Sequence, residues 1–178
     1  VITYVGNTSK RRGLLTVIES LKIIEKTIPN IKLLIIGKSS FDQVIKDKIK
    51  QNQIEKLVDF IGWIKESDIP NYLSISKLGL SPLHRNIHHD TTYANKVFQY
   101  ISIGCPVVSS NVIAQSELVE KYEIGVIFED NNVYDLSDKI IELHNDKNLY
   151  SRLKQNCLDS IEKLNNSVIS NQLISIYE

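Results

Sequence analysis

Residues 84–110, HRNIHHDTTYANKVFQYISIGCPVVSS, carry side chains that are typical of anion-binding sites. The segment holds three of the four histidines of the chain, and Lys96 follows them. Apolar spacing predicts a helix over residues 92–103, with Lys96 about one turn from its start. The side chains able to cap that start are those of Asp90, Thr91 and Thr92. A helix N-terminus beside a lysine favours the binding of a diphosphate.

The predicted helix has two faces with different compositions. Val97, Tyr100 and Ile101 recur at helical spacing, and we expect them in the core. Asn95 and Gln99 are four residues apart and share another face. We expect this second face to point at the ligand.

The histidines of the segment, His84, His88 and His89, admit two interpretations. They could bind a metal ion, or they could belong to a polar loop that covers the anion site. A structural zinc site needs four ligands, and no fourth ligand stands at a standard spacing. We therefore expect the polar loop and no metal.

A glycine and three cations follow the first apolar run of the chain, in GNTSKRRG. Gly6 permits a tight turn, and the cations are Lys10, Arg11 and Arg12. They can bind a phosphate beside a helix N-terminus, or they can form a solvated basic loop.

Two further loops offer ligand groups. In GKSS, Gly37 lets the backbone approach a ligand and Lys38 can reach an anion, although the segment also suits a plain turn. In GWIKESD, Trp63 is the single tryptophan of the chain. It either flanks a nucleobase or packs in the core, as most tryptophans do.

Short apolar runs alternate with helical patterns along the chain. The predicted strands lie at residues 2–6, 31–37, 57–64, 77–83, 106–110 and 125–129. The predicted helices lie at residues 13–28, 41–54, 66–76, 92–103, 114–122, 132–146 and 148–164. This order predicts an α/β fold, a doubly wound parallel sheet of about six strands that is Rossmann-like. Ligands of such sheets bind beyond the carboxyl ends of the strands. The tail after residue 165 is a candidate for a final helix.

The composition bounds the partners of the protein. The chain has 178 residues, with 21 Lys and Arg against 21 Asp and Glu. A net charge of zero gives no general attraction to nucleic acid or to an anionic membrane, so any anion site must be local. No signal peptide and no transmembrane segment is expected. The two cysteines are weak evidence for a disulfide, and a cytosolic setting is the simplest expectation.

Several motifs together resemble a known family. The first motif is the initial predicted strand, which is followed by a glycine and basic residues. The others are LLIIG, VDFIGWI, LSPL and, most specifically, NKVFQYISIGCPVVSSN. From about Tyr4 to Asn156 the chain resembles the carboxy-terminal domain of group 1 glycosyltransferases, the family 4 of retaining sugar-nucleotide enzymes. The resemblance implies the C-terminal half of a GT-B fold. Its ligand would be a nucleotide diphosphate sugar whose sugar passes to an acceptor hydroxyl without a cofactor or metal.

The resemblance also implies a second domain. In the family, an amino-terminal domain faces the donor domain and supplies most of the acceptor site. Because the chain starts with VITYVG and without Met, we expect residues 1–178 to be a single nucleotide-sugar-binding domain that lacks this N-terminal domain. Such a fragment is expected not to transfer sugar by itself. The whole protein is expected to act in surface polysaccharide synthesis, either in the cytoplasm or at the periphery of the inner membrane.

The family's diphosphate ligands carry over to the first loop. Its Lys-Gly pair matches Arg12 and Gly13, while Asn7 stands where the family has an Arg after Gly6. Lys10 and Arg11 are the substitutes for that missing Arg. The loop Gly62, Trp63 and Ile64 corresponds to the segment that holds the base.

Two family glutamates are replaced. The second, which binds the ribose, is Gln99 here, and a neutral amide can still bond a diol. The first falls at Thr91, and the neighbouring Asp90 is the expected catalytic substitute near the sugar. These replacements keep two alternatives open, a non-catalytic degenerate GT-B module and half of a sugar-nucleotide 2-epimerase.

Overall fold

The sheet of the protein consists of six parallel strands in a computed structural model that describes residues 1–164. The strands are β1 (Ile2–Val5), β2 (Leu33–Ile36), β3 (Val58–Gly62), β4 (Leu78–Ser81), β5 (Val107–Ser110) and β6 (Gly125–Phe128). Their order in the sheet is β3-β2-β1-β4-β5-β6. This order reverses between β1 and β4, and it confirms the predicted doubly wound architecture.

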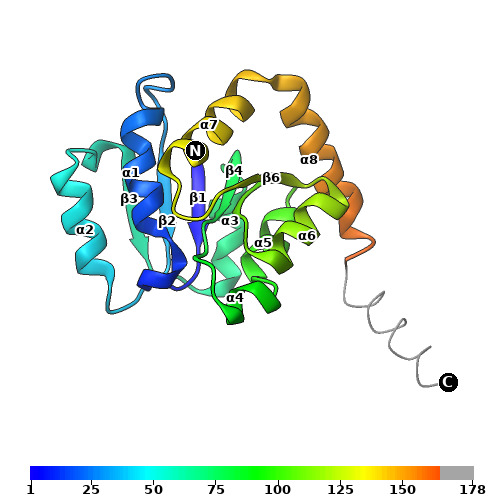
Figure 1. The fold of residues 1–178 in the computed structure, drawn as a ribbon, viewed down its shortest axis with the longest axis horizontal. Helices are drawn as coiled ribbons and strands as arrows, with labels where there is room; N and C mark the ends of the chain where they lie inside the picture. Colours follow the sequence, from blue (N-terminus) through cyan, green and yellow to red (C-terminus); the bar gives the residue numbers. More distant parts are fainter. Residues whose placement is uncertain (165–178) are drawn as a thin grey trace.

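Helices connect the strands and cover both faces of the sheet (Figure 1). They are α1 (Leu14–Ile24), α2 (Asp42–Gln51), α3 (Ile69–Leu73), α4 (Ile87–Thr91), α5 (Asn95–Ile101), α6 (Ile113–Tyr122), α7 (Val133–Asn145) and α8 (Lys147–Ile161). Short 3₁₀ turns are η1 (Lys10–Arg12), η2 (Glu55–Leu57) and η3 (Glu66–Asp68). Within residues 1–164 no helix has the length and apolarity to cross a membrane. The predicted tail helix lies outside the described residues.

The core consists of two layers because successive strand residues point to opposite faces. Ile2 and Tyr4 of β1 face the layer that includes α1, α2 and α7. Val5 of β1 and Val107 of β5 face the layer that includes α3, α5, α6 and α8. The continuous apolar runs read from the sequence therefore correspond to strands that are buried on both faces.

The helix predicted over residues 92–103 is wrong at its start. A separate helix, α4, ends at Thr91, and α5 begins only at Asn95. The hydroxyls of Thr91 and Thr92 donate to the carbonyls of Ile87 and His88, at 2.7 and 2.6 Å. They therefore close α4 and do not cap α5, whose N-cap residue is Ala94. The predicted polar loop over residues 84–91 is also wrong in part, since most of it is α4.

The carboxyl ends of β1 and β4 separate, and the hydroxyl of Tyr100 fills the gap. These strands pair only at Ile2 with Leu78 and Thr3 with Gly79. Beyond that point, the Tyr100 hydroxyl accepts a hydrogen bond from the Val5 amide at 3.0 Å. It shares its own hydrogen between the carbonyls of Thr3 and Leu80, at 3.2 and 3.1 Å. The aromatic ring fits because Gly79 has no side chain: a Cβ there would lie 2.2 Å from a ring carbon.

The two cysteines are free thiols in the core, which agrees with the weak disulfide signal. Cys105 follows α5, and Cys157 lies on α8. Burial raises the pKa of each thiol to about 12. Both therefore stay protonated at neutral pH.

We predict that Tyr100→Phe lowers the free energy of unfolding by about 1–3 kcal/mol, because the substitution keeps the ring but leaves the buried Val5 amide without an acceptor. Urea denaturation measures the change. The matched control is Tyr134→Phe, since Tyr134 is 74% exposed and its hydroxyl should matter by less than about 0.5 kcal/mol. Equal stability of the two variants would show that the Tyr100 hydroxyl does not hold the strands.

Candidate functional site

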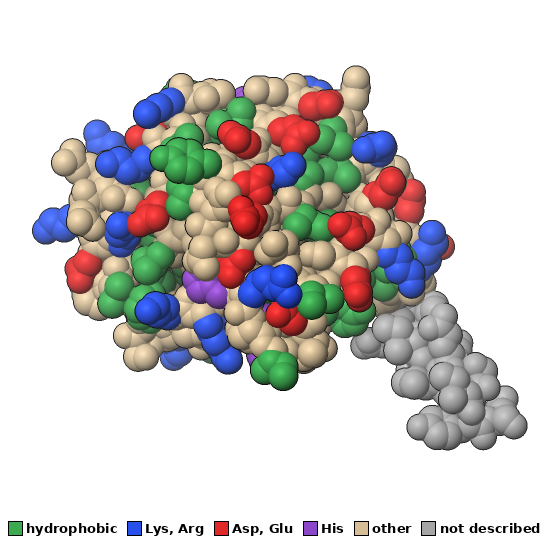
Figure 2. Space-filling view, viewed as in Figure 1, with side chains coloured by type: hydrophobic (Ala, Val, Ile, Leu, Met, Phe, Trp, Pro, Cys, Tyr) green, Lys and Arg blue, Asp and Glu red, His purple; other side chains and the backbone are tan. Residues whose placement is uncertain are grey.

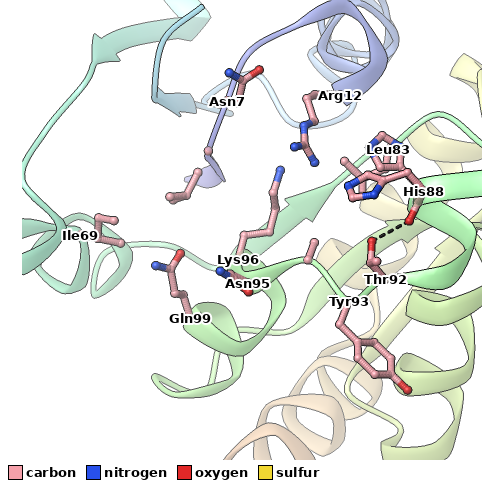
Figure 3. Close-up of a pocket in the computed structure, with 14 residues that line it drawn as sticks. Asn7, Arg12, Ile69, Leu83, His88, Thr92, Tyr93, Asn95, Lys96 and Gln99 are labelled. Carbon is pink, nitrogen blue, oxygen red and sulfur yellow. Dashed lines mark hydrogen bonds between the residues drawn. The ribbon is translucent and has the colours of Figure 1, made fainter.

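A cavity of about 420 Å³ opens at the carboxyl ends of the strands, where the strand order reverses. Its walls come from the loop after β1, from α4 and from α5 (Figure 3). The polar side chains that line it belong to Asn7, Arg12, His88, His89, Thr92, Tyr93, Asn95, Lys96 and Gln99. The first loop and the segment around Lys96 therefore meet at one cavity.

Lys96 lies inside the wall of this cavity. It is 7% exposed, and its Nζ has no hydrogen-bond partner among the described residues. The amine lies 3.7 Å from the centroid of the Tyr4 ring, which is itself buried. Burial, with Arg12 close by, holds the pKa of Lys96 well below its usual range. Lys96 is therefore a buried amine and not a surface charge.

Two more buried nitrogens face the same cavity without a partner. They are Nε of Arg12 and Nε2 of His89. Figure 3 shows Arg12 and Lys96 pointing toward one another from opposite walls. Buried polar groups are nearly always hydrogen-bonded, so a cluster of unpartnered nitrogens indicates a ligand site. Cationic donors at this position are suited to an anion.

The backbone fixes Arg12 at the cavity wall. Arg12 ends η1, and the next residue, Gly13, has a φ of 74°. A Cβ on Gly13 would lie 1.6 Å from the carbonyl oxygen of Pro82, which follows β4. The glycine therefore allows the loop after β1 to pack directly on the chain after β4.

A second cavity of about 480 Å³ continues the first toward β3. Four residues line both cavities, namely Val5, Gly6, Asn7 and Ile69. The far end is lined by Gly37, Lys38, Trp63, Ile64 and Glu66. Together the two cavities form one groove along the edge of the sheet.

Trp63 is an exposed wall of this groove. It is 64% exposed, so the interpretation as a packed core residue is wrong. Lys38 Nζ lies 5.6 Å from the centroid of its ring. A flat aromatic surface beside a cation is able to stack against a nucleobase.

Other predicted residues lie outside the walls of the groove. Lys10 and Arg11 are exposed on η1. Gly62 contributes its carbonyl, which accepts from the Gly37 amide at 2.7 Å. Thr91 donates within α4, as described above.

Asp90 has structural partners. Its carboxylate is paired with Arg85 at 3.3 Å and accepts from the backbone amide of Ile113, at the start of α6, at 3.1 Å. Asp90 does not line the cavity. Its expected catalytic role stays a prediction.

The histidines do not form a metal centre within residues 1–164, where no group of three or more potential metal ligands occurs. Nδ1 of His84 lies 2.7 Å from a carboxylate oxygen of Asp130. Sequence reasoning missed the contact between Lys96 and the Tyr4 ring and the burial of His89. The position of Tyr4 in the apolar run of β1 predicts that its side chain is buried. Nothing in the sequence predicts that its ring contacts Lys96.

The face of the molecule in Figure 2 carries no large patch of one charge. Figure 2 shows basic and acidic side chains interspersed over the displayed face. This agrees with the net charge of zero and with the expectation that any anion site is local.

We predict that Lys96→Met stabilises the unliganded protein at pH 7 by about 1 kcal/mol or more, roughly 2–4 °C in Tm. Methionine keeps an apolar chain over the Tyr4 ring and removes the buried amine. Because the folded-state pKa is below that of the unfolded chain, the unfolded chain binds the additional proton. The advantage of the variant should therefore shrink as pH rises toward about 10.5. Thermal melts across pH measure it, with the exposed Lys38→Met as control. A lower Tm for Lys96→Met would contradict the prediction.

Comparison with known proteins places this geometry in a family. The sequence profile described as "Glycosyl transferases group 1" matches residues 1–158. The chain is 28% identical over 182 residues to a capsular polysaccharide biosynthesis glycosyltransferase, CapM, of Staphylococcus aureus. The match covers 99% of this chain and 45% of CapM, so the chain spans less than half of that relative.

Solved structures show the same fold. HepE of Anabaena, in complex with UDP, superposes with a TM-score of 0.85 at 18% identity, covering 99% of this chain and 47% of HepE. The C-terminal domain of the group 1 glycosyltransferase LpcC of Francisella tularensis gives a TM-score of 0.76 at 20% identity, covering 92% of this chain and 84% of that one. The profile match, the fold and the CapM similarity agree, and the chain belongs to the group 1 glycosyltransferase family.

Proposed function

We propose that this chain is the donor-binding domain of a retaining glycosyltransferase and that it binds a nucleotide diphosphate sugar in the groove. The observation that supports this most directly is the group of three unpartnered buried nitrogens, on Arg12, His89 and Lys96, around one cavity. A cavity that buries cationic donors is suited to a diphosphate. The groove continues past Trp63, and its two parts, about 420 and 480 Å³, are of a size that holds a nucleotide sugar.

In this proposal the diphosphate lies between Arg12 and Lys96. Negative charge develops on the diphosphate as the bond to the sugar breaks. Fixed cations in a site with little water stabilise that charge, and this lowers the barrier to transfer. Gln99 is three residues beyond Lys96 on α5 and lines the same cavity, so its amide is placed to bond the ribose hydroxyls. The base lies against Trp63 and Ile64.

The activity of the whole protein is also a proposal. CapM is more than twice as long as the matched chain, and we propose a facing domain that supplies the acceptor site. The printed name of CapM supports a role in surface polysaccharide synthesis. We propose a cytoplasmic location, peripheral to the inner membrane. A catalytic role for Asp90 would require it to leave its pairing with Arg85.

The phosphate end of the groove is tested by Lys96→Met. We predict that it weakens UDP binding by about 1.5–3 kcal/mol, roughly 10- to 150-fold, because a charge-assisted hydrogen bond is lost. Uridine binding should change little, since uridine has no phosphate. Calorimetric titration of both ligands separates these effects, and UDP is the probe because HepE was solved with it. Equal losses for UDP and uridine would assign Lys96 a structural role.

The base end is tested by Trp63→Ala. We predict that it weakens uridine and UDP binding by about 1 kcal/mol or more, roughly fivefold, because base stacking on an aromatic ring is lost. Pyrophosphate binding should be unchanged. Tyr134→Ala on α7 is the control, as Tyr134 is also exposed but lies outside the groove. If Trp63→Ala binds uridine with unchanged affinity, the base does not stack on Trp63.

A further inference from the structure

His89 is the one buried histidine side chain among residues 1–164. It is 1% exposed, the residue lines the cavity, and its buried Nε2 has no hydrogen-bond partner among the described residues. His88, its neighbour on α4, is exposed. A buried ring nitrogen with no partner is costly unless a ligand supplies one.

The other ring nitrogen fixes the tautomer. Nδ1 of His89 lies 2.7 Å from the carbonyl oxygen of His84, which can only accept, so Nδ1 carries a hydrogen. The side-chain amide of Asn86 lies 2.8 Å from Nδ1 and donates to the same carbonyl at 2.9 Å. A bare Nδ1 would place its lone pair against that of the carbonyl. In the neutral ring, Nε2 is therefore the unprotonated nitrogen, and it is the ring nitrogen left without a partner.

The frame around this ring is fixed at several points. The backbone amide of His89 donates to Oδ1 of Asn86 at 3.0 Å. The backbone amide of His84 donates to the carbonyl of Arg11 at 3.0 Å, and the ring of His84 pairs with Asp130. His84, whose carbonyl contacts the ring of His89, is thus held between the loop after β1 and the chain after β6.

The charges around His89 oppose its protonation in the empty site. Burial, and then the neighbouring Arg12, Arg11 and His88, lower its pKa, while the bond to the His84 carbonyl acts in the opposite direction. Lys96 lines the same cavity from α5. Asp90, next in sequence, is paired with Arg85. A diphosphate in the cavity reverses this balance, because it brings negative charge to the free nitrogen.

We propose that His89 is a proton-carrying ligand of the bound diphosphate, neutral in the empty site and protonated from solvent when the anion enters. The cation then donates Nε2–H to a phosphate oxygen while Nδ1–H stays on the His84 carbonyl. This inference rests on the proposed function, and it adds a ligand outside the Arg12 and Lys96 pair. Protonation of His89 makes the affinity for the nucleotide sugar fall as pH rises, because the ring loses its additional proton at high pH.

The test is a pH titration of the histidine ring signals by NMR on the whole chain, with and without UDP-glucose. Both phosphates of a nucleotide sugar are diesters and stay ionised, whereas the terminal phosphate of free UDP titrates near pH 6, roughly as a phosphate monoester does. We expect saturation with UDP-glucose to raise the His89 midpoint by about one pH unit or more. By linkage, affinity then falls about tenfold or more between pH 5.5 and 8.5.

Two variants separate His89 from the remaining groups. His89→Gln keeps a neutral donor near the Nε2 position and should lose the part of the pH dependence that belongs to His89, leaving only that of Lys96. His144→Gln is the matched control, because His144 lies at the end of α7, away from the groove, and the variant should behave as the unmodified protein.

The outcomes are distinct. Binding of UDP-glucose with an unmoved His89 midpoint would overturn this inference and leave the proposed function standing. If His89→Gln keeps the full pH dependence of UDP-glucose affinity, the inference is also overturned and the proposed function still stands. Failure of UDP-glucose, UDP and the other nucleotide diphosphate sugars to bind at any pH would overturn the proposed function itself, and the inference with it.

Discussion

The hydroxyl of Tyr100 satisfies the backbone where β1 and β4 separate, and the rest of the site depends on this. Parallel strands that diverge leave amide and carbonyl groups without partners, which is unfavourable in a core. One phenol bonds three of them, on Val5, Thr3 and Leu80. The strands can therefore stay apart, and α5 can approach the sheet at the opening. Lys96 is four residues before Tyr100 on the same helix, so the side chain that reaches the cavity is positioned by the one that fills the gap.

The empty cavity is electrostatically unfavourable. Lys96, Arg12 and His89 each hold an unpartnered nitrogen away from water at the same cavity. Such a cluster lowers the stability of the unliganded fold and is offset only when an anion enters. This is the usual relation between stability and function at binding sites. It also explains why Lys96 lies over the ring of Tyr4, since an aromatic face is one of the few apolar surfaces that attract a cation.

Much of the fold could be predicted from the sequence, because continuous apolar runs and helical spacing report burial directly. The break between α4 and α5 could not: Thr91 and Thr92 are as able to begin a helix as to end one, and neither glycine nor proline marks the break. The burial of Lys96 could not be predicted either, since lysine is ordinarily exposed and the Tyr4 ring that receives it is distant in sequence. Trp63 was the opposite case, an apolar residue that tertiary structure leaves exposed.

The state of the two cysteines has a practical consequence for studies of movement. Cys105 and Cys157 are enclosed in the core, and their thiols are held protonated by burial. Maleimide and spin-label reagents react with thiolates at accessible sites, so the two native cysteines should react with them very slowly. A single cysteine introduced on the exposed surface can therefore be labelled without first removing the native ones. With two such introduced cysteines, fluorescence transfer or paramagnetic resonance measures a distance across the groove with and without ligand.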